Sequence, residues 1–196
     1  MQSTTGPRGI RAMVLALLPI VLVAAWPAVS AATLIDKDRF SDSGSDTVEE
    51  CGRTLDHTFS FTGTGHVRVG KGKQDQAFFG HSNVSFTDTF TNPDTGRSYT
   101  ETGRLTFQET RAVRVSGTIF QFTSVNAGTV RLSDSNGATV LVDRGNIRTT
   151  ILFDTLGDST PGGVELAVLS EVTHGPHPFF DLTEEQFCAL TGSLIG

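Results

Sequence analysis

Three polar residues stand out because they fall on the otherwise apolar side of a predicted strand pattern. In residues 57–69 and 78–90 the apolar side chains occupy alternate positions, with His57 and Asp88 among them, and Glu101 continues the pattern after the next turn. This alternation is typical of half-buried β-strands. Two carboxylates beside an imidazole could transfer protons or bind a cation. A solvated rim of the sheet is the alternative interpretation.

The strand register decides whether these residues meet. A slip of one residue would turn every side chain to the other face, so the apolar positions of neighbouring strands must coincide. This requirement places His57 opposite Phe90 and Phe59 opposite Asp88 across the first predicted hairpin. Across the second it places Asp88 opposite Glu101. Direct and diagonal neighbours lie about 5 to 8 Å apart, and we therefore expect the three polar side chains to approach one another.

The same face offers a candidate binding surface. A third turn, predicted at Glu109–Thr110, would bring Gln121 opposite Tyr99. The candidate ligand-binding residues are then Phe59, Phe61, Phe86, Phe90, Tyr99 and Gln121. Such a lining favours a small apolar ligand or an apolar surface of a protein partner.

A second group of candidate ligands lies near the carboxyl end. His174 and His177 have the short spacing of some metal ligands, and Asp181 follows nearby. The glycine and proline between the histidines are equally typical of a turn. We therefore expect no metal site, and no sequence motif indicates a cofactor.

The first 32 residues have the character of a secretory signal peptide. A basic start precedes an apolar run from residue 12 to 26, and small residues lead up to Ala32. That run is shorter than the roughly 20 residues of a membrane-spanning helix. We expect a secreted, extracellular protein without a membrane span after cleavage. Its net charge of −6 becomes more negative once Arg8 and Arg11 are removed, which argues against a basic stripe for nucleic acid.

The mature chain divides into three predicted segments: an acidic arm at 33–55, a β-rich body at 56–173, and a loop with one short helix at 174–196. Thr183 and Gln186 form a capping-box pattern that predicts this helix. The helix carries Cys188, and the arm carries Cys51. Two cysteines in an exported chain should pair, so a disulfide is expected to tie the helix to the arm.

The β-rich body is predicted to be an antiparallel meander of about eight strands. Turn signals at 92–96, 135–137 and 143–146 separate short alternating runs, and a bulge is expected at 117–120. Glycines on inward positions favour curvature. The predicted fold is thus all-β, a closed or partly open barrel with one short C-terminal helix, and a sandwich is the alternative.

Three features together suggest a family. An acidic segment leads into Glu50-Cys51-Gly52, the β-rich body contains Asp94-Thr95-Gly96-Arg97, and a late cysteine lies in a helix. This combination resembles exported β-rich proteins of actinobacteria. The resemblance implies an architecture without a particular chemistry.

Two function classes follow from these observations. The first is an exported, non-catalytic module that binds a small apolar ligand or a protein partner. The second is a secreted isomerase or hydrolase that uses His57, Asp88 and Glu101. No nucleophile elbow, phosphate loop, zinc quartet or dinucleotide fingerprint is present in the sequence, so the first class is preferred.

Overall fold

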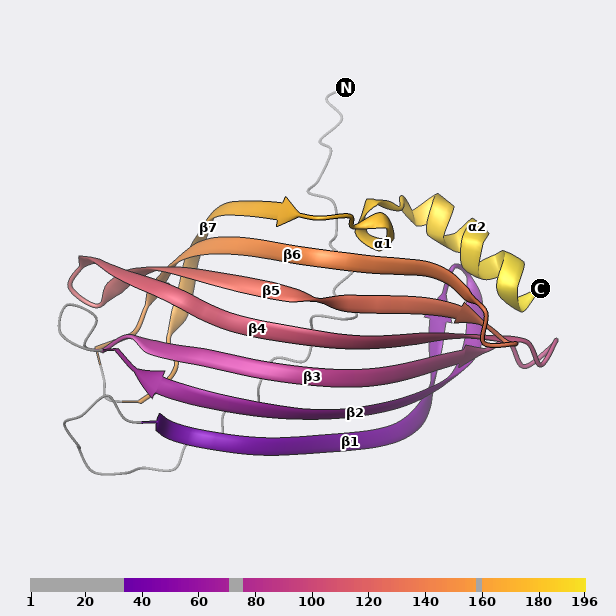
Figure 1. Cartoon of the computed structure of the whole chain (residues 1–196), viewed down its shortest axis with the longest axis horizontal. Coiled ribbons are helices and arrows are strands. Elements are labelled where there is room, and N and C mark those ends of the chain that lie inside the picture. The colour runs from indigo at the N-terminus through magenta and orange to yellow at the C-terminus, as the bar shows by residue number, and fades with distance from the viewer. Residues whose placement is uncertain (1–33, 71–75, 158–159) are drawn as a thin grey trace, which may run out of the picture.

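The computed structural model describes residues 34–70, 76–157 and 160–196, which form one antiparallel sheet followed by two helices (Figure 1). The predicted signal peptide lies outside the described residues. The strands are β1 Leu34–Glu50, β2 Arg53–Val69, β3 Phe78–Thr91, β4 Ser98–Ser116, β5 Ile119–Asp134, β6 Thr139–Asp154 and β7 Val164–His174. Each strand pairs with the next in sequence order. The predicted all-β antiparallel meander is confirmed, with seven strands in place of about eight.

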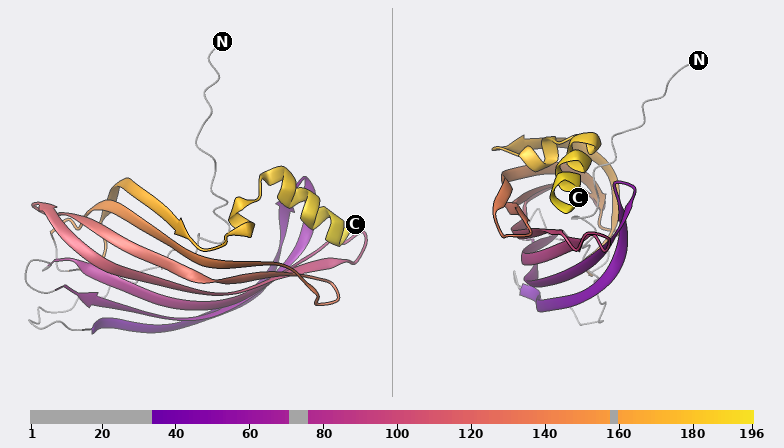
Figure 2. Two further views of the ribbon diagram at one scale, coloured as in Figure 1. Left: turned by 45° about the horizontal axis from the view of Figure 1, so that its top comes forward. Right: turned by 90° about the vertical axis from the view of Figure 1, so that its right-hand side faces the viewer.

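The sheet is not closed, so the predicted closed or partly open barrel is not confirmed. Strands β1 and β7 form its two edges, and every residue of β7 is exposed. In an up-and-down meander of seven strands the first and last strands run in the same direction. A seam between them could not continue the antiparallel hydrogen-bond ladder. Figure 2 shows a curved sheet whose concave side is covered by the helices at one end only.

The predicted acidic arm is wrong, because residues 34–50 are strand β1. This strand pairs with β2 along its length, from Leu34 opposite Arg68 to Glu50 opposite Arg53. Its aspartates, glycine, glutamates and lysine are poor strand formers in general. An edge strand tolerates them, since one side of it is solvated and charges discourage pairing with other chains.

The third predicted hairpin is also wrong. Strand β4 continues through Glu109–Thr110 with a bulge, and the chain reverses at Gly117, whose φ is 51°. The bulge expected at 117–120 is therefore the true turn. Gln121 pairs with Val113, at the far end of the sheet from Tyr99, so the predicted pairing of Gln121 with Tyr99 does not occur.

One of the two later turn predictions holds. The chain turns at Gly137, where φ is 82°, as the Asn-Gly pair predicts. The turn predicted at 143–146 instead lies inside strand β6. One long strand thus replaces two short predicted ones, which contributes to the overestimated strand number.

The buried apolar residues form two separate clusters. The helix-end cluster consists of Leu55, Phe90, Tyr99, Leu132 and Ile195. The hairpin-end cluster consists of Ala77, Phe79, Ala112, Phe120 and Phe122. A sheet with only one end of one face covered by helices cannot build a continuous core, and each end buries its own side chains.

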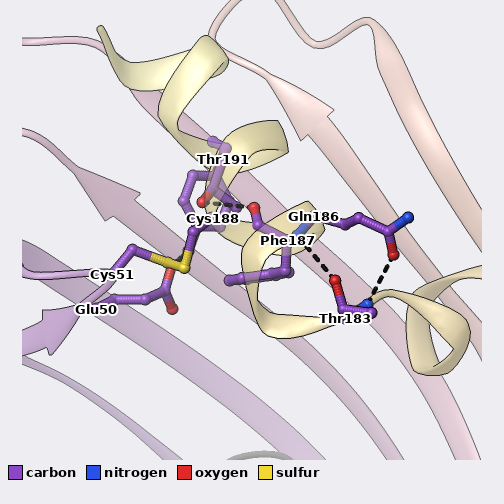
Figure 3. Close-up of a disulfide and its surroundings, with 8 residues drawn as sticks. Glu50, Cys51, Thr183, Gln186, Phe187, Cys188 and Thr191 are labelled. Atoms are coloured by element: carbon purple, nitrogen blue, oxygen red, sulfur yellow. Dashed lines mark hydrogen bonds between the residues drawn. A yellow bond between two sulfur atoms is a disulfide. The ribbon is translucent and has the colours of Figure 1, made fainter.

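The helices α1 Pro178–Asp181 and α2 Glu184–Ile195 complete the helix end. The predicted disulfide between Cys51 and Cys188 is confirmed, with an S–S distance of 2.03 Å (Figure 3). The capping box is also confirmed, because Gln186 N–H donates to Thr183 Oγ1 at 3.2 Å and Thr183 N–H donates to Gln186 Oε1 at 2.9 Å. Within the described ranges, no helix is long and apolar enough to cross a membrane.

The β3–β4 turn holds the other end of α2. The hydroxyl of Thr95 donates to the carbonyl of Ile195 at 2.6 Å, and the side-chain amide of Asn92 donates to the same carbonyl at 3.3 Å. Gly96 adopts a φ of 67° in this turn, as the sequence predicts. The last helix is therefore fixed at one side by a covalent bond and at its carboxyl end by hydrogen bonds.

Candidate functional site

The predicted polar cluster forms on the concave face of the sheet. His57 Nδ1 lies 2.8 Å from Asp46 Oδ1, and His57 Nε2 lies 3.3 Å from Asp88 Oδ1. Asp88 is directly opposite Glu101 in the register, and Glu101 is only 6% exposed. The sequence missed Asp46 because its strand was predicted to be an arm. Its alternation with Gly44 and Val48 was the available signal.

The register that creates this cluster is the predicted one. His57 pairs with Phe90, and Phe59 pairs with Asp88. Phe90 in turn pairs with Tyr99. Strands β2 and β3 pair without a register shift, and so do β3 and β4, so the alternation of side chains is undisturbed between the candidate residues.

A continuous line of rings runs beside the carboxylates. The His57 ring stacks on Phe90 at a centroid distance of 4.6 Å and an angle of 14°, and Phe90 stacks on Tyr99 at 4.9 Å. Further ring contacts at 5.7 to 6.4 Å extend the line. We call this line the aromatic strip; its members are Phe40, Phe61, Phe59, His57, Phe90 and Tyr99. The stacking holds the plane of the imidazole.

Glycines allow rings on the concave face to lie close to the backbone. A Cβ built on Gly103 would lie 2.2 Å from the ring of Phe86, and one built on Gly44 would lie 2.9 Å from the ring of Phe59. In each case the ring belongs to the residue paired directly with the glycine. These glycines are needed for close approach of a side chain, and the sheet is curved without closing into a barrel.

Electrostatics at the cluster centre on Asp88. Partial burial raises the pKa of the Asp88 carboxyl, while the hydrogen bond and charge of His57 act in the opposite direction. Desolvation is the largest cause of the shift.

The geometry also limits what His57 can do. Both of its ring nitrogens lie within hydrogen-bond distance of aspartate oxygens. These contacts occupy both polar atoms of the imidazole and connect strands β1, β2 and β3 through His57.

A tyrosine connects the cluster to the disulfide. The hydroxyl of the fully buried Tyr99 donates to Glu50 Oε1 at 2.5 Å. Glu50 directly precedes Cys51, and Figure 3 shows it beside the bond to Cys188. The aromatic strip thus ends under α2 at one side, whereas Phe40, Phe59 and Phe61 at the other side are only half-buried.

The residues considered as metal ligands do not come together. His177 is buried, its Nδ1 lies 3.0 Å from Asp143 Oδ1, and the other carboxylate oxygen accepts the N–H of Phe179 at 3.1 Å. His174 pairs with Asn146 at the exposed end of β7, and Asp181 is exposed. Across the described ranges, no three or more His, Cys, Asp or Glu residues are placed to hold a metal ion. The sequence missed Asp143 because it was assigned to a turn.

Glu109 is a second ionisable residue that the sequence did not single out. Burial raises the pKa of Glu109 to about 7, although the Gly80 N–H, which donates to its Oε2 at 2.5 Å, acts to lower it. Glu109 helps to line a hollow of about 230 Å³ together with His66 and His81. The pair Glu109–Thr110 was predicted to be a turn, and this prediction gave no reason to expect burial of the carboxyl group.

Comparisons of this chain with protein-family models, with curated proteins and with solved structures give no match. Its function therefore has to be argued from the geometry of the described residues.

Proposed function

We propose that the protein is an exported, non-catalytic binding module that engages a protein partner through the concave face of its sheet. The supporting observation is the aromatic strip, which is half-buried at Phe40, Phe61 and Phe59, beyond the region covered by α2. An open sheet has no enclosed interior for a small apolar ligand. An extended segment of another protein fits an open, elongated face better. The disulfide fits an extracellular setting.

The charges beside the strip define the chemistry of this partner. Asp42 pairs with Phe61 and Asp46 pairs with His57, so both carboxylates share the face with the rings. Asp88 lies on the same face. Aromatic faces and carboxylates both attract Lys and Arg side chains. The partner is thus a segment that carries basic and apolar side chains together.

Binding is favoured over catalysis because of the way the polar residues are engaged. A general base needs a lone pair within hydrogen-bond reach of the proton that it removes. Both nitrogens of His57 are directed to aspartates. The isomerase or hydrolase alternative would require one of these contacts to be given up.

A panel of synthetic peptides tests this proposal. We expect a peptide with alternating Lys and Leu residues to bind the oxidised protein more tightly than a peptide with Glu in place of Lys. Phe61→Leu should weaken binding about threefold to fivefold, because it removes the ring face and keeps an apolar side chain. Phe153→Leu is the matched control, since Phe153 is half-buried beside the hairpin-end cluster. Equal binding of both peptides, or equal effects of the two variants, would contradict the proposal.

A further inference from the structure

The opposite face of the sheet has a different composition. We call it the polar face; it carries the even-numbered residues of β2 and β4 and the odd-numbered residues of β3 and β5, which pair across the strands without shifts in this region. One row across it consists of Ser45, Thr58, Thr89, Thr100 and Ser133. The next row consists of Ser43, Ser60, Thr87, Thr102 and Arg131. Hydroxyl groups thus form a grid spaced about 4.8 Å across strands and about 6.7 Å along them.

The two faces also differ in charge. Exposed basic residues on the polar face include Lys37, Arg39, Arg104, Arg131, Arg144 and Arg148, while its exposed acidic residues Glu49 and Asp56 lie near the β1–β2 turn. The acidic residues Asp38, Asp42, Asp46, Asp88, Glu101 and Asp143 occupy the concave face. The net charge of −6 does not show this distribution, because the strand alternation places charges separately on the two faces.

A hollow of about 410 Å³ lies in the middle of the polar face. It is lined by Thr62, Gly63, Thr64, Asn83, Ser85 and Arg104. Thr106 Oγ1 donates to Asn83 Oδ1 at 2.8 Å, which orients the amide of Asn83. Arg104 is exposed. It pairs with Thr129 of β5, which in turn pairs with Arg144 of β6, so the two arginines lie in one row across three strands. Guanidinium, hydroxyl and amide groups therefore converge at one depression.

We propose that the polar face binds an acidic polysaccharide. Arginine side chains recognise carboxylate or sulfate groups with paired hydrogen bonds, and the surrounding hydroxyl and amide groups match the hydrogen-bonding hydroxyls of sugars. Single-stranded nucleic acid is disfavoured, since it needs aromatic side chains for base stacking, and the described residues of the hydroxyl rows are serines, threonines and an arginine.

The net charge of the protein does not itself favour an acidic polymer. The protein has a net charge of −6, so long-range electrostatics oppose any polyanion. Attraction has to come from the local arrangement of the polar face. Binding of this kind weakens steeply with salt, because counterions released from the polyanion favour association at low ionic strength.

The experiment measures binding of the oxidised protein to immobilised heparin and to polygalacturonate, with dextran as the neutral polysaccharide, over a range of salt concentrations. We expect binding to the two acidic polymers and none to dextran. Arg104→Gln should weaken the affinity about tenfold, as expected for loss of a charged hydrogen-bonding group. Arg97→Gln is the control because it removes the same charge from the exposed β3–β4 turn, outside the polar face.

Three outcomes would overturn the proposal: no binding to either acidic polymer at low salt, equal loss of affinity in the Arg104 and Arg97 variants, or tighter binding to single-stranded DNA of matched charge. Phe61→Leu lies on the concave face and should leave polysaccharide binding unchanged. This variant separates the polar-face proposal from the proposed partner site, so that either can fail alone.

Discussion

The two ends of the sheet bury similar numbers of apolar side chains, yet they are closed in different ways. At the helix end, α2 covers Leu55, Phe90 and Tyr99, and the disulfide and the β3–β4 turn hold the helix in place. At the hairpin end, Phe120 and Phe122 pack with Phe79 of β3 and with Ala77, which precedes β3, and no helix or disulfide of the described residues closes this end. The helix end thus depends on the disulfide and on the hydrogen bonds of the β3–β4 turn, whereas the hairpin end depends on packing alone.

The comparison shows how an open sheet can be stable without a central core. Strands of 11 to 19 residues run between the two clusters, so a strand fixed at both ends is also positioned in its middle. The concave face there is left with half-buried rings. Both proposed binding surfaces lie in this middle region.

The largest expected effect on stability comes from removing the disulfide between Cys51 and Cys188. Cys51→Ser combined with Cys188→Ser should lower the free energy of unfolding by about 5 kcal/mol, because the disulfide closes a loop with a sequence separation of 137. Hydrogen exchange should show that α2 loses protection before the β4–β5 hairpin does. Reduced wild-type protein is the control and should behave like the double variant. Equal loss of protection at both ends would contradict the difference between them.

The next effect tests packing at the hairpin end. Phe122→Ala should destabilise the protein by about 3 to 5 kcal/mol, since Phe122 is 3% exposed and contacts both Phe79 and Phe153. Chemical denaturation measures the change. Val115→Ala on the same hairpin serves as control, because Val115 is 57% exposed and should shift stability by less than about 0.5 kcal/mol. A similar cost for both variants would mean that this end has no specific core.

A pH-dependent effect is expected from the buried carboxyl group of Glu109. Its pKa is raised from 4.5 to about 7 in the folded state, so the protonated form is favoured by folding. The resulting stabilisation is complete below about pH 4.5, and it is lost as pH rises through about 7.

Glu109→Gln keeps an acceptor for the Gly80 N–H and removes this titration. We expect the variant to be more stable than wild type at pH 8, on the order of 2 kcal/mol, and to show a flatter melting temperature between pH 5 and 8. Thermal unfolding across this range decides the matter. Glu171→Gln, on the exposed strand β7, is the control. Parallel pH profiles for Glu109→Gln and wild type would rule out a buried carboxyl group.

The smallest expected effect concerns the turn that receives the end of α2. Gly96→Val should cost about 1 to 2 kcal/mol, because a β-branched residue is strained at a φ of 67°. Asp94→Val in the same turn is the matched control, as Asp94 is not in the left-handed region. Denaturant midpoints compare the two. If the Gly96 variant has the wild-type midpoint, strain in this turn does not reach the helix end.

The sequence predicted the parts of the fold in which the alternation of side chains is uninterrupted. Strands β2, β3 and β4 up to residue 107 keep one parity, and the register that brings His57, Asp88 and Glu101 together follows from it. The disulfide and the capped helix were predictable because cysteine pairing and capping boxes have local chemical causes.

The end of β4 and the whole of β1 were not predicted, because a bulge and an unusual composition obscure the alternation of side chains there. A bulge at Glu109–Thr110 changes the parity of β4, so that Ala112 is buried while Val113 and Val115 are exposed. The turn was therefore predicted too early, at Glu109–Thr110, whereas the strand continues to Ser116. Strand β1 was missed because its composition is that of a solvated segment, and with it Asp46 was lost from the candidate site.

The position of the two cysteines has a consequence for the order in which the chain folds. All strand pairs join sequence neighbours, so hairpins can form one after another as soon as each pair of strands exists, and such local contacts form early. Cys51 lies in the first turn, whereas Cys188 lies in the last helix. The native disulfide cannot form until all seven strands have been made. The disulfide that closes the helix end can therefore form only after the chain has been made as far as α2, later than the first hairpins can form.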